Sequence, residues 1–587
     1  MRSRFFFRWR LAIAGREAAW AAAAVALLSL ALGLWGIGWG LPGPDRLRAL
    51  PEGALSEDAA RRLAESWQRL YTEVRRAHEE MLPAEPVTYA RGLEVTAPGW
   101  TFPPDNLVGS VRSLLLQSEN PDEKKAFIIL SQMRPGKLEF RPLYVQYGGA
   151  FIYPLGLFLK AASLVGAAVL TPGAAHYLSH PGDMGRLYLL ARLFILIFQV
   201  GSALVLFDMG RRLSGLRTGL AAAVLFVLSP MVLAHSHVVK PHPYAAFWAL
   251  AALRWMLLAQ ESGRPRHYVW AGGAAGVAVG ANLALSILMF CPILAWAARC
   301  AGGATGGRQW RWAGVGTALA AAVVLGTNPY LAVSPQAFAW ELQVYAPMRW
   351  DVAPERMWAM VLSSFSSLGV GATLLGLGAL FRASWRPGAR RILAAVCILG
   401  GLVLWGRFST FAEDPGSLRL FYPFIAVALL LGADWLVSLR PVWGLGLGLL
   451  VALETAAGAG VTLENLRRSA GPDSAGRRAA AWIETHVPAG ASVGLTRRPE
   501  PAHTPAFRYD RYRLMICDRV ADLKEPPGWI VVEGAARPYM DSLLQKSYHL
   551  AAAFPRYEFA GIRLTSDPFI NGAFYIYERG APGGDAP

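Results

Sequence analysis

The chain has 587 residues, of which 54% are hydrophobic and only 17% are charged, whereas an ordinary soluble domain carries roughly 25% charged residues. The missing charge is concentrated in long stretches, and a helix needs about 20 apolar residues to cross the hydrocarbon core of a bilayer. Lipid offers the backbone no hydrogen-bond partners, so such stretches are expected to be helical. This composition excludes a purely soluble protein. Stretches without any Asp, Glu, Lys or Arg are 18–44, 267–298, 312–340 and 357–381.

The net charge of +17, from 57 Lys and Arg against 40 Asp and Glu, does not indicate nucleic-acid binding. Such binding uses a basic surface with interleaved aromatic side chains, and no such pattern occurs outside the apolar stretches. Many arginines instead flank these stretches, as on the cytoplasmic side of membrane proteins. We therefore expect membrane lipids, and no nucleic acid, as partners. The arginines before the first span are Arg2, Arg4, Arg8, Arg10 and Arg16.

With a cytoplasmic N-terminus, the apolar pattern predicts roughly eleven transmembrane helices in the cell (inner or plasma) membrane. Arginine clusters at 299–311 and 382–391 fall on the predicted cytoplasmic side, as the positive-inside rule requires. The arginines at 211–217 fall on the predicted outside, so either the region 173–186 is re-entrant or an early boundary is wrong. The predicted spans are 18–41, 149–171, 187–207, 217–238, 241–259, 268–297, 312–333, 357–381, 391–407, 420–438 and 442–462.

Two parts of the chain lie outside these spans. Residues 41–148 form a long first external loop within a transmembrane domain that covers 1–467, and residues 468–587 form a small external, soluble α/β domain. The fold class is therefore an α-helical polytopic membrane protein with a C-terminal α/β domain. In these two parts the sequence predicts helices at Leu55–Met81, Pro121–Met133 and Gly476–His486, and strands at Ser492–Leu495, Trp529–Val532 and Phe574–Tyr577.

The first external loop contains Asn120-Pro121-Asp122-Glu123 at the predicted start of a helix. Asn120 is a good N-cap, Pro121 suits the first helical turn, and Glu123 has the spacing of a capping box. Two adjacent carboxylates near a membrane surface also suit catalysis, because a carboxylate can act as a general base. Local sequence alone favours capping over catalysis.

The surrounding segment, from Asn120 to Gly156, reads NPDEKKAFIILSQMRPGKLEFRPLYVQYGGAFIYPLG. It resembles the dolichyl-phosphate-mannose-protein mannosyltransferases, integral membrane glycosyltransferases with the GT-C fold (glycosyltransferase family 39 type). The resemblance covers the first external loop specifically and the spans loosely. It implies that the acidic pair is catalytic and that two tyrosines line the substrate site. The matching positions are Asp122, Glu123, Pro142, Tyr147, Gly148, Tyr153 and Pro154.

The resemblance also points to residues that would hold the phosphate of a lipid-linked donor. Arg192 lies in the predicted third span, where a charge is costly, although snorkelling near a helix end is the alternative. Lys240 and His242 stand at a break between two spans, where relatives often carry an acidic residue. This departure puts an acid-based metal site in doubt and suits a phosphate instead. Arg419 and Tyr422 open the tenth span, with an interfacial anchor as the alternative.

His235 and His237 have the His-x-His spacing of a metal-ligand pair, but the sequence offers no third ligand. We therefore predict no metal-binding residue, and a divalent metal such as Mg or Mn stays open as a cofactor. The sequence also lacks a phosphate-binding P-loop, a nucleophile elbow and an HExxH motif, so nucleotide hydrolysis and classical hydrolase chemistry lack support.

These features predict a membrane glycosyltransferase (hexosyl or pentosyl) that moves a sugar from a polyprenyl-phosphate-linked donor to an acceptor protein or glycolipid. The reaction would take place at the outer face of the membrane and would invert the anomeric centre, with Asp122 as general base. The cations would stabilise the departing phosphate. A polytopic transporter or lipid flippase could use the same cations, and a catalytically inactive scaffold is a third reading. The long loop and the soluble tail favour the enzyme.

Overall fold

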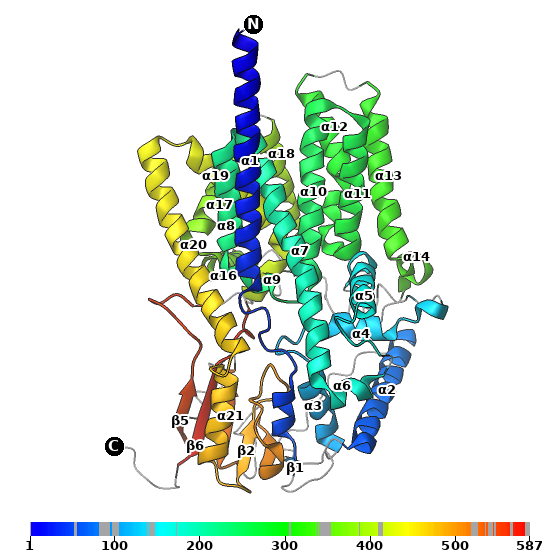
Figure 1. Cartoon of the computed structure of the whole chain (residues 1–587), viewed down its shortest axis with the longest axis vertical. Coiled ribbons are helices and arrows are strands. Elements are labelled where there is room, and N and C mark those ends of the chain that lie inside the picture. Colours follow the sequence, from blue (N-terminus) through cyan, green and yellow to red (C-terminus); the bar gives the residue numbers. More distant parts are fainter. Residues whose placement is uncertain are drawn as a thin grey trace.

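The fold is that of a helical membrane protein, with a bundle of helices at one end and a small sheet domain at the other (Figure 1). The N-terminal helix α1 lies along the bundle, and the last strand of the described residues belongs to the sheet. This computed structural model describes residues 2–51, 56–80, 94–96, 105–137, 140, 147–171, 173–303, 307–336, 339, 354–386, 388–408, 415–517, 526–534, 536–537, 544, 547–563 and 567–580.

The described part of the bundle is built from apolar helices. Five helical stretches are long and apolar enough to cross a membrane, or six if α8 and α9, bent by 62°, form one broken span. The predicted total of roughly eleven stays a prediction. The helices are α1 (Arg2–Leu34), α7 (Pro181–Ser214), α8 (Leu216–Leu228), α9 (Pro230–Ser236), α10 (Pro241–Ser262), α11 (Pro265–Ala281), η3 (Leu283–Phe290), α12 (Cys291–Ala301), α13 (Gln309–Thr327), α14 (Tyr330–Val333), α16 (Pro354–Leu368), α17 (Val370–Ser384), α18 (Ala389–Phe408), η5 (Pro415–Phe421), α19 (Tyr422–Ser438) and α20 (Pro441–Ala470).

The described part of the predicted first external loop is largely helical. The amphipathic helix predicted near its start is confirmed as α2, whose N-cap Ser56 accepts a hydrogen bond from the Ala59 amide at 3.2 Å. The elements from here to α7 are η1 (Pro44–Ala49), α2 (Glu57–Glu79), β1 (Glu94–Thr96), α3 (Asp105–Leu116), α4 (Lys124–Gln132), η2 (Pro135–Lys137), α5 (Gly149–Leu164) and α6 (Ala174–Ser179).

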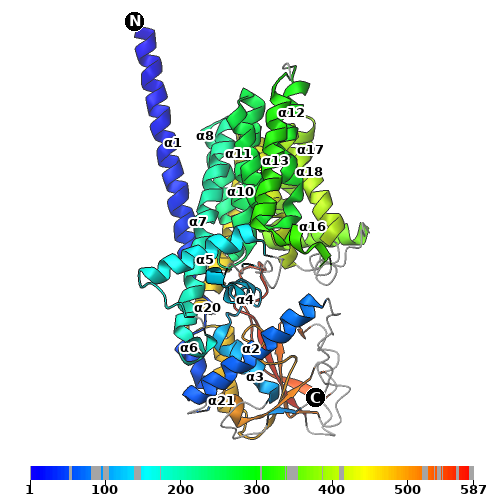
Figure 2. The ribbon, with the colours of Figure 1, turned by 90° about the vertical axis from the view of Figure 1, so that its right-hand side faces the viewer.

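The structure differs from the predicted span at 149–171. Only 16 residues, Gly149–Leu164, are helical there, and at about 1.5 Å per residue such a helix is shorter than the hydrocarbon core of about 30 Å. Figure 2 shows this helix, α5, lying across the axis of the bundle rather than along it. Apolar composition predicted the helix correctly, but composition does not report the direction in which a helix runs.

The predicted single span at 268–297 is also wrong. The helix breaks at Asn282, whose backbone is extended and whose side chain caps the Ala284 amide. The chain then returns through η3 and α12, so that Arg299 Nη1 donates to the Gln260 and Glu261 carbonyls at 2.9 and 3.0 Å. Since these carbonyls lie just before α11, helices α11 and α12 are antiparallel neighbours.

Arginines collect at the end of the bundle that carries the N-terminus. Arg390 at the start of α18 donates to Ser214 Oγ at 2.6 Å and to Asp434 Oδ2 at 2.7 Å, which joins the end of α7 to the last part of α19. Arg254 of α10 pairs with Asp208 of α7 at 2.7 Å. We call this the arginine end of the bundle.

The arginine end resolves the conflict at 211–217. Since α5 does not run along the bundle, α7 is the next helix after α1 to do so, and it carries Arg211 and Arg212 to the same end as Arg299 and Arg390. Compared with the predicted spans, one is lost at α5 and one is added because α11 and α12 replace a single span. The two changes cancel, so the loops after α12 keep the sides that were predicted for them. By the positive-inside rule this end is the predicted cytoplasmic one.

The C-terminal domain is a six-stranded mixed sheet with helix α21 packed against it. Strands β2, β4 and β6 and helix α21 coincide with the predicted elements, whereas β3 and β5 were not predicted. Strand β1 comes from the first external loop and pairs with β3, so the loop and the tail share one sheet. The order is β1-β3-β2-β4-β6-β5, with α21 (Ala475–His486), β2 (Ser492–Leu495), β3 (Arg513–Ile516), β4 (Trp529–Glu533), β5 (Tyr548–Phe554) and β6 (Phe574–Arg579).

This arrangement predicts the sidedness of three exposed positions. In a variant lacking the four native cysteines, single cysteines at Arg217 and Arg308 are expected on one side of the membrane and one at Lys160 on the other. An impermeant maleimide applied to the outside of intact cells should label only Lys160→Cys. Labelling of Arg217→Cys and Arg308→Cys from opposite sides would contradict the shared arginine end.

Candidate functional site

The site is built around the carboxylate of Asp122, in the turn between α3 and α4. Its Oδ2 lies 2.9 Å from Lys240 Nζ and 3.7 Å from Arg419 Nη2, and its Oδ1 lies 3.1 Å from Lys125 Nζ. Lys240 precedes α10 and Arg419 lies in η5, so three distant segments meet here, opposite the arginine end. The Asp122 side chain is 24% exposed and is therefore reachable. We call these four residues the Asp122 cluster.

Local sequence explains how each segment presents its side chain. Asn120 Oδ1 accepts a hydrogen bond from the Asp122 amide at 3.1 Å, the turn that Asn forms most readily with the amide two residues on. Lys240 has an extended backbone because Pro241 follows it and begins α10. The Lys240 side chain is only 4% exposed, so its ammonium is held against Asp122.

The cations keep Asp122 ionised. The Lys240 ammonium, helped by Lys125 and Arg419, lowers the pKa of Asp122 well below its usual value, against the opposing effect of burial. A carboxylate held this way stays ionised but is a weak base. Its basicity therefore depends on how much positive charge surrounds it.

Tyr147 contacts the same turn, whereas Tyr153 does not. The Tyr147 hydroxyl donates to the Asp122 carbonyl at 3.3 Å, and burial raises the pKa of this phenol, so that it stays a donor. The Tyr153 hydroxyl donates to the Phe140 carbonyl at 3.4 Å, away from the cluster. Pro142, the remaining part of the predicted motif in this stretch, lies outside the described residues.

The two glycines after Tyr147 allow α5 to meet the bundle. A Cβ on Gly148 would lie 1.9 Å from the Gly280 carbonyl oxygen, and one on Gly149 would lie 2.0 Å from the Thr327 carbonyl oxygen. Any side chain at either position would therefore push α5 away from the ends of α11 and α13. The glycines keep Tyr147 within reach of Asp122.

Glu123 and Arg192 form a buried ion pair outside the Asp122 cluster, which differs from the roles expected for them. Arg192 Nε and Nη2 donate to the two Glu123 carboxylate oxygens at 2.9 and 2.7 Å, and both side chains are 0% exposed. Arg192 Nη1 donates to the Ile37 and Trp39 carbonyls, and the Val239 amide donates to Glu123. Neither residue can touch a donor phosphate or an acceptor in this arrangement. Nor does Glu123 close the predicted capping box, because the guanidinium is a stronger partner.

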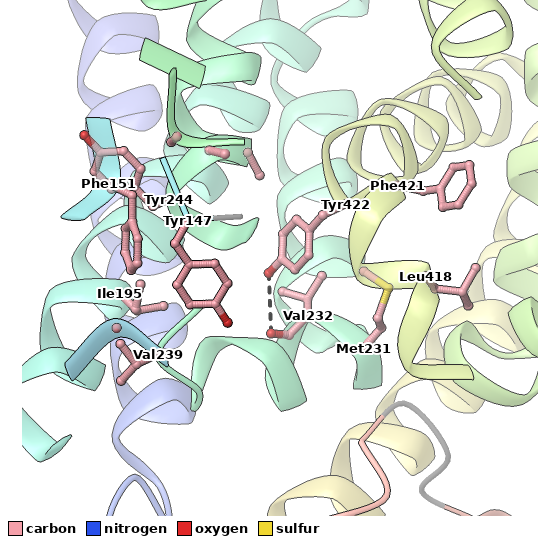
Figure 3. Close-up of a cluster of buried hydrophobic side chains, with 14 of the residues drawn as sticks. Tyr147, Phe151, Ile195, Met231, Val232, Val239, Tyr244, Leu418, Phe421 and Tyr422 are labelled. Atoms are coloured by element: carbon pink, nitrogen blue, oxygen red, sulfur yellow. Dashed lines mark hydrogen bonds between the residues drawn. The ribbon is translucent and has the colours of Figure 1, made fainter. Parts of the chain in front are cut away.

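Tyr422 also lies away from the cluster. It is fully buried, and its hydroxyl donates to Gln199 Oε1 at 2.7 Å and lies 3.5 Å from the Val232 carbonyl oxygen. Figure 3 shows this hydroxyl directed toward Val232 among apolar side chains. The arrangement assigns Tyr422 to helix packing rather than to phosphate binding, and leaves Arg419 as the residue of this motif at the site.

His242 lies beside the cluster on α10. It is partly exposed, interacts electrostatically with Arg419, Lys240 and Asp122, and its Nδ1 lies 3.3 Å from Asn282 Nδ2. It is therefore close enough to take part in binding a group held by the two cations.

Sequence reasoning missed Asp567, a residue of the C-terminal domain. Its carboxylate is 2% exposed and accepts hydrogen bonds from Asn120 Nδ2 at 2.9 Å and from the Phe569 amide at 3.0 Å. Burial raises its pKa above the usual value, with nearby Lys240 and Arg419 acting in the opposite sense. A lone aspartate in the tail carries no motif, so only the folded structure reveals it.

The histidines do not form a metal site within the described residues, which contain no group of three or more His, Cys, Asp or Glu side chains that could hold an ion. His237 Nδ1 and Nε2 contact the Leu233 and Trp35 carbonyls at 2.7 and 3.0 Å. Its neighbour in the His-x-His spacing, His235, is buried. Use of Mg or Mn therefore stays a prediction without assigned ligands.

No family model and no curated protein matches this sequence. Among solved structures, the chain is similar to ArnT from Cupriavidus metallidurans bound to undecaprenyl phosphate, with 15% identity and a TM-score of 0.43 over 79% of this chain and 96% of that one. It is also similar to an Archaeoglobus fulgidus oligosaccharyltransferase, with 15% identity and a TM-score of 0.40 over 69% and 64%. A third similar structure is the mycobacterial arabinofuranosyltransferase AftD, with 15% identity and a TM-score of 0.39 over 97% and 40%. The chain thus spans less than two thirds of the oligosaccharyltransferase and of AftD.

The buried ion pair predicts a large loss of stability in Glu123→Gln. The change leaves the Arg192 guanidinium buried without its counter-charge, and breaking such a pair typically costs about 3–5 kcal/mol. Thermal unfolding in detergent should show a clear drop in midpoint. As a control, Asp58→Asn, which breaks the exposed pair with Arg61, should change stability by less than about 1 kcal/mol. Equal effects of the two variants would contradict a structural role for Glu123.

Proposed function

We propose that this protein is a membrane glycosyltransferase that transfers a sugar from a polyprenyl-phosphate-linked donor to an acceptor at the outer membrane face. The observation that carries this proposal is the Asp122 cluster. A reachable carboxylate lies 2.9 Å from Lys240 and 3.7 Å from Arg419 at the end of the bundle opposite the arginine end. The resemblance of the first external loop to the mannosyltransferases supports the same chemistry. Whether the sugar is a hexose or a pentose is left open.

In the proposed reaction, an acceptor hydroxyl attacks the anomeric carbon of the donor sugar. The new carbon–oxygen bond forms as the bond from the anomeric carbon to the phosphate oxygen breaks, and the polyprenyl phosphate leaves with that electron pair. Asp122 takes the hydroxyl proton as general base. Lys240 and Arg419 stabilise the negative charge that develops on the departing phosphate. A single displacement inverts the anomeric centre.

Donor binding would also activate the base. With the site empty, Lys240 and Arg419 act on Asp122 alone and hold its pKa down. A bound phosphate would share both cations and bring its own negative charge close to the carboxylate, and each effect raises the pKa of Asp122. The carboxylate thus becomes a better base only when a donor is present.

The central prediction concerns Asp122→Asn. This change keeps the size and removes the base, so transfer from a radiolabelled polyprenyl-phosphate sugar in membranes should fall about 10²- to 10⁴-fold. The matched control is Asp208→Asn, which also removes a carboxylate paired with several arginines, but at the arginine end. This control should keep transfer within about threefold once corrected for folded protein.

Two outcomes would count against the proposal. Normal transfer by a well-folded Asp122→Asn variant would show that Asp122 is not the general base. Movement of lipid-linked sugar across the membrane without any covalent product, in wild-type protein, would instead favour a transporter or flippase.

The pH dependence provides a second prediction. In the free protein the cations hold the pKa of Asp122 low, so protonation should not limit kcat/KM until the pH falls below about 4, the usual Asp value. In the donor complex the pKa is higher, and the acid limb of kcat should lie at a higher pH than that of kcat/KM. Steady-state profiles over donor concentration measure both limbs. Coincident limbs would contradict activation of Asp122 by the donor.

A further inference from the structure

We infer that Asp567 of the C-terminal domain is a positioning residue, which holds Asp122 in place through the side chain of Asn120. This inference rests on the proposed function, because it concerns the placement of the proposed base. It means that the C-terminal domain contributes a residue that positions the proposed base.

The contacts form a short continuous chain. Asp567 Oδ2 accepts from Asn120 Nδ2 at 2.9 Å, and Asn120 Oδ1 accepts from the Asp122 amide at 3.1 Å. One amide side chain is thus held at one end by Asp567 and holds Asp122 at the other. Asp567 is itself fixed, because its second oxygen accepts from the Phe569 amide at 3.0 Å.

Burial makes this chain rigid. Asn120 is 0% exposed and Asp567 is 2% exposed, so water does not readily replace either partner. Loss of the Asp567 carboxylate would leave the Asn120 amide without this acceptor in a buried place, where a lost hydrogen bond is costly. The turn that carries Asp122 would then adjust its position.

Asp567 also balances charge at the site. It interacts electrostatically with Lys240 and Arg419, the two cations that face Asp122. The ion pairs of Lys240 and Arg419 are with Asp122, so loss of Asp567 should leave the groups proposed to bind phosphate in place.

Small displacements of a catalytic group matter greatly, since a shift of about 1 Å can cost roughly 10²-fold in rate. A residue that only holds the base should affect turnover and leave donor binding almost intact. This separates positioning from a direct role in binding the phosphate, which would raise KM.

The test compares Asp567→Ala, Asn120→Ala and the double variant in the full-length protein. Asp567→Ala should lower kcat about 10- to 100-fold, with the KM for the lipid-linked donor within about twofold of wild type. Because both residues act through one chain of contacts, the double variant should be no slower than the slower single variant. A product of the two single effects would overturn the inference.

Asn571→Ala is the matched control. Asn571 lies in the same part of the C-terminal domain and is also buried, but it accepts from the Ala475 amide at 2.9 Å and donates to Asn465 of α20 at 3.0 Å. It anchors the domain without touching the Asp122 turn. Its kcat should stay within about threefold of wild type, whereas an equal loss in both variants would indicate a merely structural role.

A second readout does not depend on transfer. Hydrogen exchange of residues 118–123 should quicken at least about tenfold in Asp567→Ala and Asn120→Ala, and not in Asn571→Ala, because the Asp122 amide loses its fixed acceptor. Unchanged exchange would overturn the inference, whether or not the wild-type protein shows transfer. Absence of transfer by the wild-type protein would separately refute the proposed function. Active wild-type protein with an unaffected Asp567→Ala would overturn the inference alone.

If Asp567→Ala does not fold, Asp567→Asn replaces it in both measurements. Asparagine keeps one carbonyl oxygen and can accept only one of the two hydrogen bonds. It should therefore give an intermediate kcat, and a kcat equal to that of wild type would count against the proposed positioning.

Discussion

The arrangement around the site depends on one buried ion pair, that of Glu123 and Arg192. Arg192 stands inside α7, yet its guanidinium also binds carbonyls of Ile37 and Trp39, just beyond α1, while Glu123 accepts from the Val239 amide before α10. A charge placed in a membrane bundle must find such partners. Because the partners of the Arg192–Glu123 pair come from different segments, the pair holds four parts of the chain together. These are the end of α1, α7, the first external loop and the start of α10. The adjacent Asp122 is thereby left facing Lys240.

Two neighbouring carboxylates thus take opposite tasks because of their surroundings. Glu123 is sealed from solvent and supports the structure, whereas Asp122 is reachable and surrounded by cations. Sequence could not assign these tasks, since adjacent acidic residues look alike until the partners are known. It did identify Asp122, Lys240 and Arg419 as residues of one site, on the strength of a motif and of unusual charges near apolar stretches. Arg192 and Tyr422, which were expected to bind phosphate, are instead buried in the packing of the bundle.

The pattern of apolar residues predicted helices better than it predicted their directions. Most described helices lie within or next to the predicted ranges, because burial in lipid demands long apolar stretches. The errors fall at α5 and at α11 with α12, where direction is decided by packing: glycines bring α5 against other helix ends, and Asn282 turns the chain back. In the tail, strands with strong apolar patterns were predicted, and β5, which exposes several residues, was not. No local pattern could have linked Asn120 to Asp567, which are 447 residues apart.

The sharing of one sheet between the first external loop and the tail has a consequence for biogenesis. Strand β1 emerges early in synthesis, but its partner β3 comes only after the last helix of the bundle. Strand β1 therefore stays unpaired while all intervening helices are inserted. Such late long-range pairing is slow and prone to misassembly. A chain truncated before the tail would keep its bundle but never complete the loop. The edge of the sheet at β3 is thus closed only after both the loop and the tail have been made.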